Sequence, residues 1–408
     1  MVESDQTRIP EWPEALDVRR LLEQGWRPTP FHQFIVKIHS RCNLRCDYCY
    51  IYEMADQGWK AQPRRMARPV VEQVARRIAE HARANRLDRV SVIIHGGEPL
   101  LAGVDHLRFA LATIRGACEP DVRVDFSLQT NAVLINEFFL EVFLEFGVEV
   151  GVSMDGDREG HDRHRLRRDG EGSYDDVRTG LYQLTGSRYQ HLFSGFLATI
   201  DLANDPVRTY EALLEWNPPG VDFLLPHGNW DNPPPGRPPD DSTPYADWLI
   251  AVFDRWYGAK IQETSVRLPG QIMRLLLGRG SSSEAVGLGP VAMAVIETNG
   301  QIEQVDSLKS AFDGASGTFL HVSRDPFDTA LHLPSIAARQ IGTLALATGC
   351  RTCDLHETCG GGLYPHRYRT GTGFRNASVY CRDLYRFIDH IRTRLISDLD
   401  GFTTRGRS

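Results

Sequence analysis

Six short apolar runs, separated by stretches with helical periodicity, constrain the fold of this 408-residue chain more than any other feature. Pro69 stands at a helix start, Asn136 is placed to cap a later helix, and Ser173 with Asp176 forms a capping-box pattern. Repeated strand–helix units predict a parallel sheet covered by helices, that is, an α/β fold. Periodicity leaves open a partial (β/α)6 barrel and an open doubly wound sheet. The six runs are residues 31–40, 90–97, 124–131, 148–156, 191–201 and 220–228.

Five of the six runs end in polar or glycine-containing motifs: HSRC, HGGEP, QTN, SMDG and PHG. In both architectures the binding and catalytic groups lie at the C-terminal edge of the parallel strands, so we expect a functional site there. A proline-rich loop at 229–244 follows the last run, and glycine-rich loops with clustered cysteines begin near residue 280. The predicted parts are an N-terminal extension at 1–30, a barrel at 31–270 and a C-terminal domain at 271–408.

Three cysteines, Cys42, Cys46 and Cys49, lie directly after the first run in the order CNLRCDYC. Thiolates this close in sequence can converge on one metal centre. A structural zinc site takes four protein ligands, whereas a 4Fe–4S cluster held by three cysteines leaves one iron open for a ligand. The pattern favours such a cluster. The alternatives are a zinc site completed by His39 and a set of buried structural cysteines.

The composition argues against several classes of protein. A formal charge of -7 disfavours a general nucleic-acid or anionic-membrane binder, since such binders gather cations. The N-terminus lacks the features of a secretory signal, and the most apolar helical stretch, 138–146, is interrupted by Glu141 and Glu145. We expect a cytoplasmic protein that binds neither nucleic acid nor membrane. In that reducing compartment its eight cysteines indicate metal binding or catalysis rather than disulfides.

The spacing CxxxCxxC, with Tyr48 before the last cysteine, resembles the signature of the radical SAM superfamily. The resemblance implies that the three cysteines hold a 4Fe–4S cluster whose open iron binds S-adenosylmethionine (SAM). It also implies that one electron, delivered by a reducing donor such as flavodoxin or ferredoxin, splits SAM into methionine and a 5′-deoxyadenosyl radical. The chain would then be an enzyme that begins radical chemistry on another molecule.

Residues at other strand ends resemble the SAM-binding groups of this superfamily. The motif of Gly96, Gly97, Glu98 and Pro99 resembles the one that contacts the SAM amino group, although such a sequence also forms an ordinary strand-to-helix turn. Polar groups at the third and fourth strand ends either cap the next element or, as the resemblance implies, surround the SAM ribose and carboxylate. With Tyr48, the candidates for those contacts are Gln129, Asn131, Ser153 and Arg165.

Four more cysteines gather near the C-terminus, and their spacing fits a zinc knot and an iron–sulfur cluster equally well. The region resembles the SPASM domain, whose full pattern of seven cysteines holds two auxiliary clusters in peptide-modifying radical SAM enzymes. Leu363 and Val305 stand at two of those positions, a further upstream cysteine is missing, and all the losses fall on one cluster. The resemblance therefore implies one auxiliary 4Fe–4S cluster, and Cys118 is left over as a buried residue. The four cysteines are Cys350, Cys353, Cys359 and Cys381.

Asp306 directly follows the position of a missing cysteine. In anaerobic sulfatase-maturing enzymes the aspartate at this place looks like the catalytic base, and we expect that role here; a solvated loop aspartate is the alternative. The stretches 294–312 and 359–381 resemble the FxsB-type branch of SPASM enzymes. Members of that branch mature ribosomally made peptides by joining an aromatic ring to the β-carbon of a nearby residue, which gives a three-residue cyclophane.

These resemblances predict a maturase of a precursor peptide. The hypothesis is that a β-hydrogen is removed, the carbon adds to an aromatic ring, Asp306 accepts the released proton and the auxiliary cluster accepts the electron. The alternatives are another SPASM-type oxidation, such as anaerobic sulfatase maturation, and a non-catalytic zinc-dependent peptide-binding protein. Only about 30 residues precede the first run, too few for a leader-recognition domain. We therefore expect the leader to bind the barrel, the C-terminal domain or a separate partner.

Overall fold

A ten-stranded sheet forms the centre of the protein, seen in a computed structural model that describes residues 11–237, 239–281 and 283–405. The first three strands of its spatial order pair antiparallel, and all later neighbours pair parallel. In that order the strands are β12 (Gly317–His321), β11 (Gln301–Glu303), β10 (Met293–Ile296), β1 (Gln33–His39), β3 (Arg89–Gly96), β4 (Arg123–Thr130), β5 (Glu149–Ser153), β7 (Phe193–Thr199), β8 (Gly220–Leu224) and β9 (Ser265–Val266).

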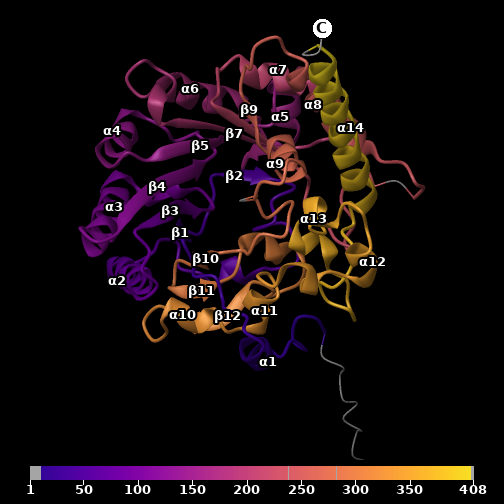
Figure 1. Ribbon diagram of the computed structural model, residues 1–408. Coiled ribbons are helices and arrows are strands. Elements are labelled where there is room, and N and C mark those ends of the chain that lie inside the picture. Colours follow the sequence, from indigo (N-terminus) through magenta and orange to yellow (C-terminus); the bar gives the residue numbers. More distant parts are fainter. Residues whose placement is uncertain (1–10, 238, 282, 406–408) are drawn as a thin grey trace, which may run out of the picture.

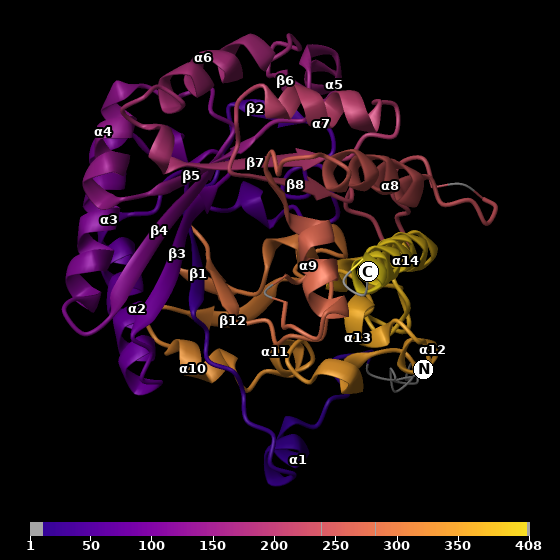
Figure 2. The same ribbon diagram turned by 45° about the horizontal axis from the view of Figure 1, so that its top comes forward.

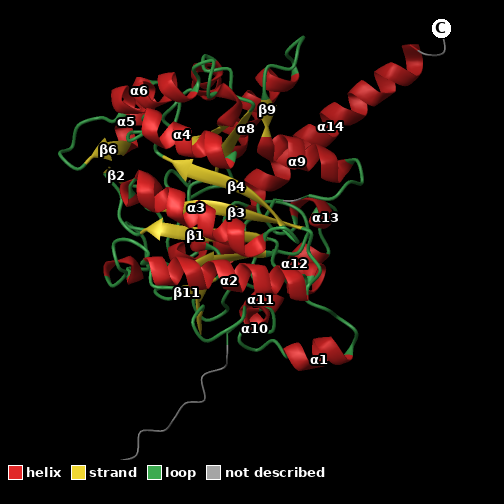
Figure 3. Cartoon of the chain, turned by 90° about the vertical axis from the view of Figure 1, so that its left-hand side faces the viewer, coloured by secondary structure: helices red, strands yellow, loops and turns green. Residues whose placement is uncertain are grey.

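Each of the six predicted runs forms a parallel strand, and the partial barrel is confirmed. Figure 2 shows the strands curving inside an outer arc of helices, with the C-terminal part of the chain on the open side. Figure 3 shows α2, α3 and α4 lying over β1, β3 and β4. The outer helices are α2 (Arg68–Ala84), α3 (Val104–Cys118), α4 (Glu137–Phe146), α6 (Tyr174–Leu184), α7 (Pro206–Leu214) and α8 (Pro244–Tyr257).

Local sequence signals explain where most of these helices begin. Pro69 lies in the first turn of α2, and Asn136 caps α4 by accepting hydrogen bonds from the Phe138 and Phe139 amides. The capping box predicted at Ser173 is wrong. Its hydroxyl donates to the Arg165 carbonyl at 2.6 Å, so it makes no cap of α6, and a tertiary contact replaces the local one.

The C-terminal part of the chain extends the barrel's own sheet. Strand β10 pairs parallel with β1, placing Phe34 beside Ala294 and Val36 beside Ile296. The division predicted near residue 270 falls inside α9 (Arg267–Leu276). Figure 1 shows α14 (Cys381–Arg405) running alongside this region, and it contacts both α8 and α9. The sheet is therefore continuous across the predicted boundary.

Short elements complete the structure. Among the described residues, no helix has both the length and the apolar character that crossing a bilayer requires. The short elements around the site are β2 (Leu44–Cys46), α5 (Arg158–His164), β6 (Arg165–Arg167), the 3-10 turn η4 (Asp306–Ser310), α12 (Thr348–Arg351) and α13 (His356–Cys359).

Candidate active site

The loop after β1 carries the first three cysteines to the C-terminal edge of the sheet. Its strand β2 pairs antiparallel with β6, which places Cys46 opposite Arg165. Arg168 holds the same loop by donating a hydrogen bond to the Cys42 carbonyl at 2.7 Å. Asn131, at the end of β4, lies 3.6 Å from the Cys42 sulfur through its Nδ2 atom. The arginine-rich segment therefore positions the cysteine loop.

A cavity of about 200 Å³, which we call the inner cavity, opens beside these cysteines. All three thiols line it together with the ends of β3, β4, β5 and β8. Glu98 and Pro99, which were predicted to contact SAM, do not line this cavity. The predicted SAM-contacting residues that do line it are Tyr48, Gly96, Gly97, Gln129, Asn131, Ser153 and Arg165.

The thiol spacing tests which metal centre the cysteines suit. A tetrahedral zinc ion with Zn–S bonds of about 2.3 Å holds its thiolates about 3.8 Å apart. Within the described part of the chain, no three cysteine sulfurs all lie within 4.8 Å of one another. Neither cysteine set is thus drawn together around a single ion. Three thiols spread around one end of a cavity suit a larger iron–sulfur cluster with a ligand beside it.

Two glycines allow the end of β3 to approach the cysteine loop. A Cβ atom on Gly97 would lie 1.9 Å from the Tyr52 hydroxyl oxygen, and one on Gly96 would lie 2.1 Å from the His39 carbonyl oxygen. Any side chain at either position would push the two segments apart. These glycines therefore bring the backbone of β3 to the wall of the inner cavity.

Glu98 is a structural link between strand ends. Its carboxylate accepts hydrogen bonds from the Thr130 hydroxyl at 2.8 Å and from the amides of Asn131 and Leu100 at 2.9 and 3.0 Å. Burial raises the pKa of Glu98 to about 7, although these donors act in the opposite direction. The carboxylate ties the end of β3 to the end of β4, and in this arrangement it points away from the inner cavity.

Tyr48 and Arg165 form a polar bridge across the inner cavity. Arg165 donates to the Tyr48 hydroxyl at 2.6 Å, and that hydroxyl donates to Asp155 at 2.5 Å. Burial lowers the pKa of Arg165, but Tyr48, Cys46 and Asp155 outweigh it and raise that pKa well above its usual range. A fixed positive charge therefore lies in the cavity wall, where it can attract a carboxylate.

A second cavity of about 910 Å³, the outer cavity, lies against the inner one. Tyr48, Thr199, Pro226 and His227 line both cavities. The outer cavity is lined largely by apolar groups from the ends of β7 and β8 and the loop that follows, with a few charged groups. Among the charged groups, His164 bridges Asp47 and Asp201 at 3.0 and 3.2 Å. The space is large enough for several residues of a bound polypeptide.

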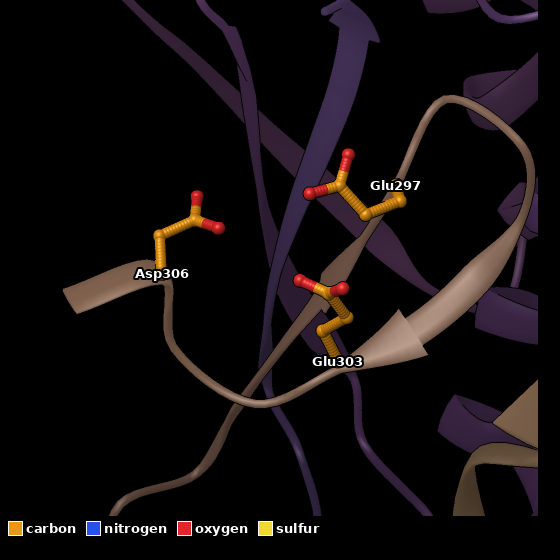
Figure 4. Close-up of side chains that lie close together, drawn as sticks. All are labelled: Glu297, Glu303 and Asp306. Atoms are coloured by element: carbon orange, nitrogen blue, oxygen red, sulfur yellow. The ribbon is translucent and has the colours of Figure 1, made fainter. Parts of the chain in front are cut away.

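Asp306 belongs to a buried charge network. Lys37 on β1 lies 2.7 Å from the Asp306 carboxylate and 2.8 Å from Glu297. Lys309 lies 2.9 Å from Glu303 and 3.4 Å from Asp306. Figure 4 shows the carboxylates of Glu297, Glu303 and Asp306 gathered in one place. Two ammonium groups balance most of this negative charge, so the cluster is an ion network rather than a metal site.

The network keeps Asp306 ionised. Burial alone would raise the pKa of Asp306, but Lys37 and Lys309 lower it to about 2. Asp306 lines neither the inner nor the outer cavity. The alternative of a solvated loop aspartate is wrong, because the residue is only 5% exposed. Of the two lysines that hold it, Lys309 lies three residues away, whereas Lys37 comes from β1 and is not indicated by any local pattern.

The second cysteine set comes together from α12, α13 and the start of α14. Burial raises the pKa of Cys381, and the neighbouring Cys350 and Cys353 raise it further. Burial also raises the pKa of Cys359, and the neighbouring Cys381 and Cys350 add to that rise. Arg367 donates to the Gly360 and Gly362 carbonyls at 2.7 and 2.5 Å and so folds the glycine run that follows Cys359. The four predicted cysteines therefore lie together. Cys118 is buried in α3, away from both sets.

Two histidines at the site were missed in the sequence. His95 and His227 both line the inner cavity, and burial lowers the pKa of each. Position could have identified them, because each lies in a strand-end motif, HGGEP or PHG, whose other residues drew attention first.

Comparison with known proteins identifies the first half of the chain. Residues 36–195 match the profile of the Radical SAM superfamily. The cysteine-type anaerobic sulfatase-maturating enzyme of Clostridium novyi is 27% identical over 273 residues, which cover 65% of this chain and 71% of that protein. The serine-type enzyme of Bacteroides thetaiotaomicron is 23% identical over 404 residues, 89% of each chain.

Solved structures match the whole fold. Native anSMEcpe with bound AdoMet superposes with a TM-score of 0.76 at 21% identity, covering 90% of this chain and 99% of that one. Streptococcus suis SuiB bound to its precursor peptide SuiA gives a TM-score of 0.60 at 15% identity, covering 89% and 78%. Residues 36–195 are therefore similar to the radical SAM superfamily, and the chain as a whole shares the fold of the solved structures of anSMEcpe and SuiB.

Proposed function

We propose that the protein is a radical SAM maturase of a ribosomally made peptide, which it crosslinks by joining a side-chain β-carbon to an aromatic ring. The observation that carries the proposal is the outer cavity, which is large enough for a peptide segment and shares part of its wall with the inner cavity. A peptide side chain reaching through the shared wall would meet whatever the inner cavity holds. Relatives with this fold bind peptides in their solved structures, which supports a polypeptide substrate.

The similarity to the superfamily implies a 4Fe–4S cluster and SAM, and the inner cavity has suitable groups for both. Cys42, Cys46 and Cys49 would hold the cluster, and the bound pair would supply the radical that removes a hydrogen atom from the peptide. Arg165 would attract the SAM carboxylate, and the backbone of Gly96 and Gly97 would approach its amino group. A reducing partner such as flavodoxin or ferredoxin would supply the electron.

The C-terminal cysteines would hold one auxiliary 4Fe–4S cluster. Val305, which stands at one of the missing cysteine positions of the SPASM pattern, is buried in an apolar cluster, and this supports the count. In that cluster the rings of Tyr364 and Phe374 stack with centroids 4.6 Å apart, and Tyr368 packs against Phe374 at 5.1 Å. The sulfur spacing in both cysteine sets speaks against the zinc-dependent binding protein.

The catalytic role of Asp306 stays a prediction. Its low pKa leaves it ionised, as a proton acceptor must be. Its ion pairs with two lysines and its absence from both cavity walls are unfavourable to direct contact with a substrate. Product formation by an Asp306→Asn variant at the wild-type rate would remove it from the mechanism.

A second candidate function is oxidation of a cysteine or serine to formylglycine in a protein. The relatives named above, which are sulfatase-maturating enzymes, favour it. The cysteine count favours crosslinking instead, because the chain has only four cysteines for auxiliary clusters, enough for one.

Anaerobic reconstitution with iron and sulfide, followed by incubation with SAM, dithionite and peptides, tests the proposal. The peptides carry Trp-Ala-Asn or Phe-Ala-Arg, with a Cys-Ala-Pro-Ser-Arg peptide for the second function. We expect about eight irons per chain, 5′-deoxyadenosine, and an aromatic peptide that is two hydrogens lighter and keeps a ring-linked fragment after proteolysis. An aldehyde on the third peptide alone would establish the second function. A colourless protein that binds zinc and releases no 5′-deoxyadenosine would contradict both.

A further inference from the structure

His227, in the PHG motif that follows β8, lies where the two cavities meet. It lines both of them, next to Pro226. The loop that carries it also lines the outer cavity at Gly228. A side chain in this position faces a peptide in the outer cavity and the reacting atoms at the mouth of the inner one. Among the histidines that line the two cavities, His227 is the one that lines both.

The ring nitrogens of His227 are free. Within the described part of the chain, no residue makes a hydrogen bond to either of them. Nδ1 is buried, whereas Nε2 does not belong to the buried unpartnered atoms and so keeps accessible surface, which the cavity walls provide. A buried histidine in a native protein usually has a partner for its ring. The accessible Nε2 at the cavity junction is therefore free to accept a hydrogen bond or a proton from a ligand.

The ring is held from both halves of the molecule. Tyr50, next to the last cysteine of the first set, packs edge-on against His227 with ring centroids 4.6 Å apart. His366 of the C-terminal extension also packs against the His227 ring, with ring centroids 5.7 Å apart. Tyr380 contacts His366 at 4.9 Å and donates a hydrogen bond to the Pro226 carbonyl at 2.7 Å. These contacts fix the direction in which Nε2 points.

The other candidate bases at the site are already engaged. Asp306 is held by two lysines, and His95 Nδ1 lies 3.0 Å from the Gly96 carbonyl. Burial lowers the pKa of His227 to about 4, so its ring is neutral near pH 7 and can accept a proton. The rings packed against it do not oppose this state: burial raises the pKa of Tyr50 and lowers the pKa of His366, so both are uncharged.

We propose that His227 is a catalytic residue whose Nε2 takes the proton that the peptide loses during its oxidation. The inference rests on the proposed function. Once the β-carbon has lost a hydrogen atom and bonded to the aromatic ring, that ring carries one surplus hydrogen and one unpaired electron. The ring C–H bond breaks and its proton passes to Nε2, while an iron–sulfur cluster held by one of the two cysteine sets would accept the electron. Aromaticity returns, and the imidazolium releases its proton to water in the outer cavity.

A weak base is sufficient for this step because loss of the electron makes the ring hydrogen strongly acidic. The same proton acceptor would serve the second candidate function, since oxidation of a carbon radical beside oxygen or sulfur also releases one proton and one electron. His227 is thus required whichever peptide is the substrate.

Substitution of His227 separates hydrogen removal from proton loss. The variant His227→Phe keeps an aromatic ring between Tyr50 and His366, and His227→Gln keeps a polar group near Nε2. Both should still release 5′-deoxyadenosine with the Trp-Ala-Asn, Phe-Ala-Arg or Cys-Ala-Pro-Ser-Arg peptide. The yield of oxidised peptide per 5′-deoxyadenosine should fall about 100-fold, the usual contribution of a positioned base. The exposed His191 provides the control, since His191→Gln should keep the wild-type ratio.

A wild-type ratio in either His227 variant, or the same uncoupling in Asp306→Asn alone, would overturn the assignment. Labelling with diethyl pyrocarbonate gives a readout without turnover, because this reagent attacks accessible neutral imidazole. Peptide mapping should find His227 modified and His366, whose two ring nitrogens are buried, unmodified. An unmodified His227 would contradict the proposal even if no test peptide reacted. If His227 were labelled and His366 were not, but none of the test peptides reacted, the result would count against the proposed substrates.

Discussion

At the scale of single residues, the site depends on how closely backbones approach. Gly97 lies where a methyl group would meet the Tyr52 hydroxyl and the backbone of Arg41, at 1.9 and 2.6 Å. Arg41 itself is fixed by hydrogen bonds from its guanidinium to the Ser40 hydroxyl and the Trp59 carbonyl, both at 2.8 Å. The cysteine loop therefore has little freedom to move away.

The substitution Gly97→Ala should consequently displace the cysteine loop. We expect at least a tenfold loss of SAM affinity, because a misplacement of about 1 Å at a reacting site costs around 100-fold in comparable enzymes. Equilibrium dialysis with labelled SAM on reconstituted protein measures it. Gly116→Ala is the matched control, since a Cβ there meets nothing within 4 Å. That change should stabilise α3 by about 0.5–1 kcal/mol. Wild-type SAM affinity in Gly97→Ala would refute the close-approach argument.

At the scale of elements, the charge network joins β1 to the turn η4. Lys37 is contributed by β1, Glu303 by β11, and Asp306 with Lys309 by η4. Asp306→Asn would leave Lys37 with one carboxylate instead of two. Because breaking a buried ion pair costs about 3–5 kcal/mol, the urea midpoint should fall clearly. The exposed pair of Arg83 and Asp121 is the control, and Asp121→Asn should cost less than about 1 kcal/mol.

The acid dependence of this contribution has a definite sign. The pKa of Asp306 is about 2 in the folded protein, below its ordinary value of 3.8. The stabilisation is therefore complete above pH 3.8 and is lost as the pH falls from 3.8 towards 2. The difference in stability between wild type and Asp306→Asn should shrink over that range. A difference that stays constant down to pH 2 would show that the carboxylate is not stabilised by charge.

Local pattern predicted the elements well and their long-range contacts poorly. Each apolar run became a strand because burial on both faces of a parallel sheet demands such runs. The motifs at the strand ends met at one cavity for the same topological reason. The hydrogen-bond partners of Glu98 could not be predicted, because the contact with the Asn131 amide joins two strand ends that lie 33 positions apart in the sequence. The pairing of β10 with β1 and the ion pair of Lys37 with Glu297 join residues about 260 positions apart, which no local signal reports.

At the scale of the whole molecule, the C-terminal extension covers an edge of the barrel. Strand β1 lies inside the sheet only because β10 pairs with it. A chain truncated after residue 276 would expose the hydrogen-bonding edge of β1 and the apolar side chains packed there. We expect such a fragment to aggregate during expression, as size-exclusion chromatography would reveal. A monomeric, folded fragment would show instead that the barrel is an independent domain.

The position of Lys37 has a consequence for how such enzymes diversify. One ammonium group, on the strand that leads into the first three cysteines, is neutralised by carboxylates that the other half of the chain supplies. If that half were exchanged for the corresponding half of a relative, Lys37 would be left buried without an ion pair unless the new residues at 297–309 carried the same charges. New substrate ranges are therefore easier to reach by altering the loops around the outer cavity than by swapping modules. Chimeras joined after α9 should be active only when Lys37 and the carboxylates that pair with it come from the same protein.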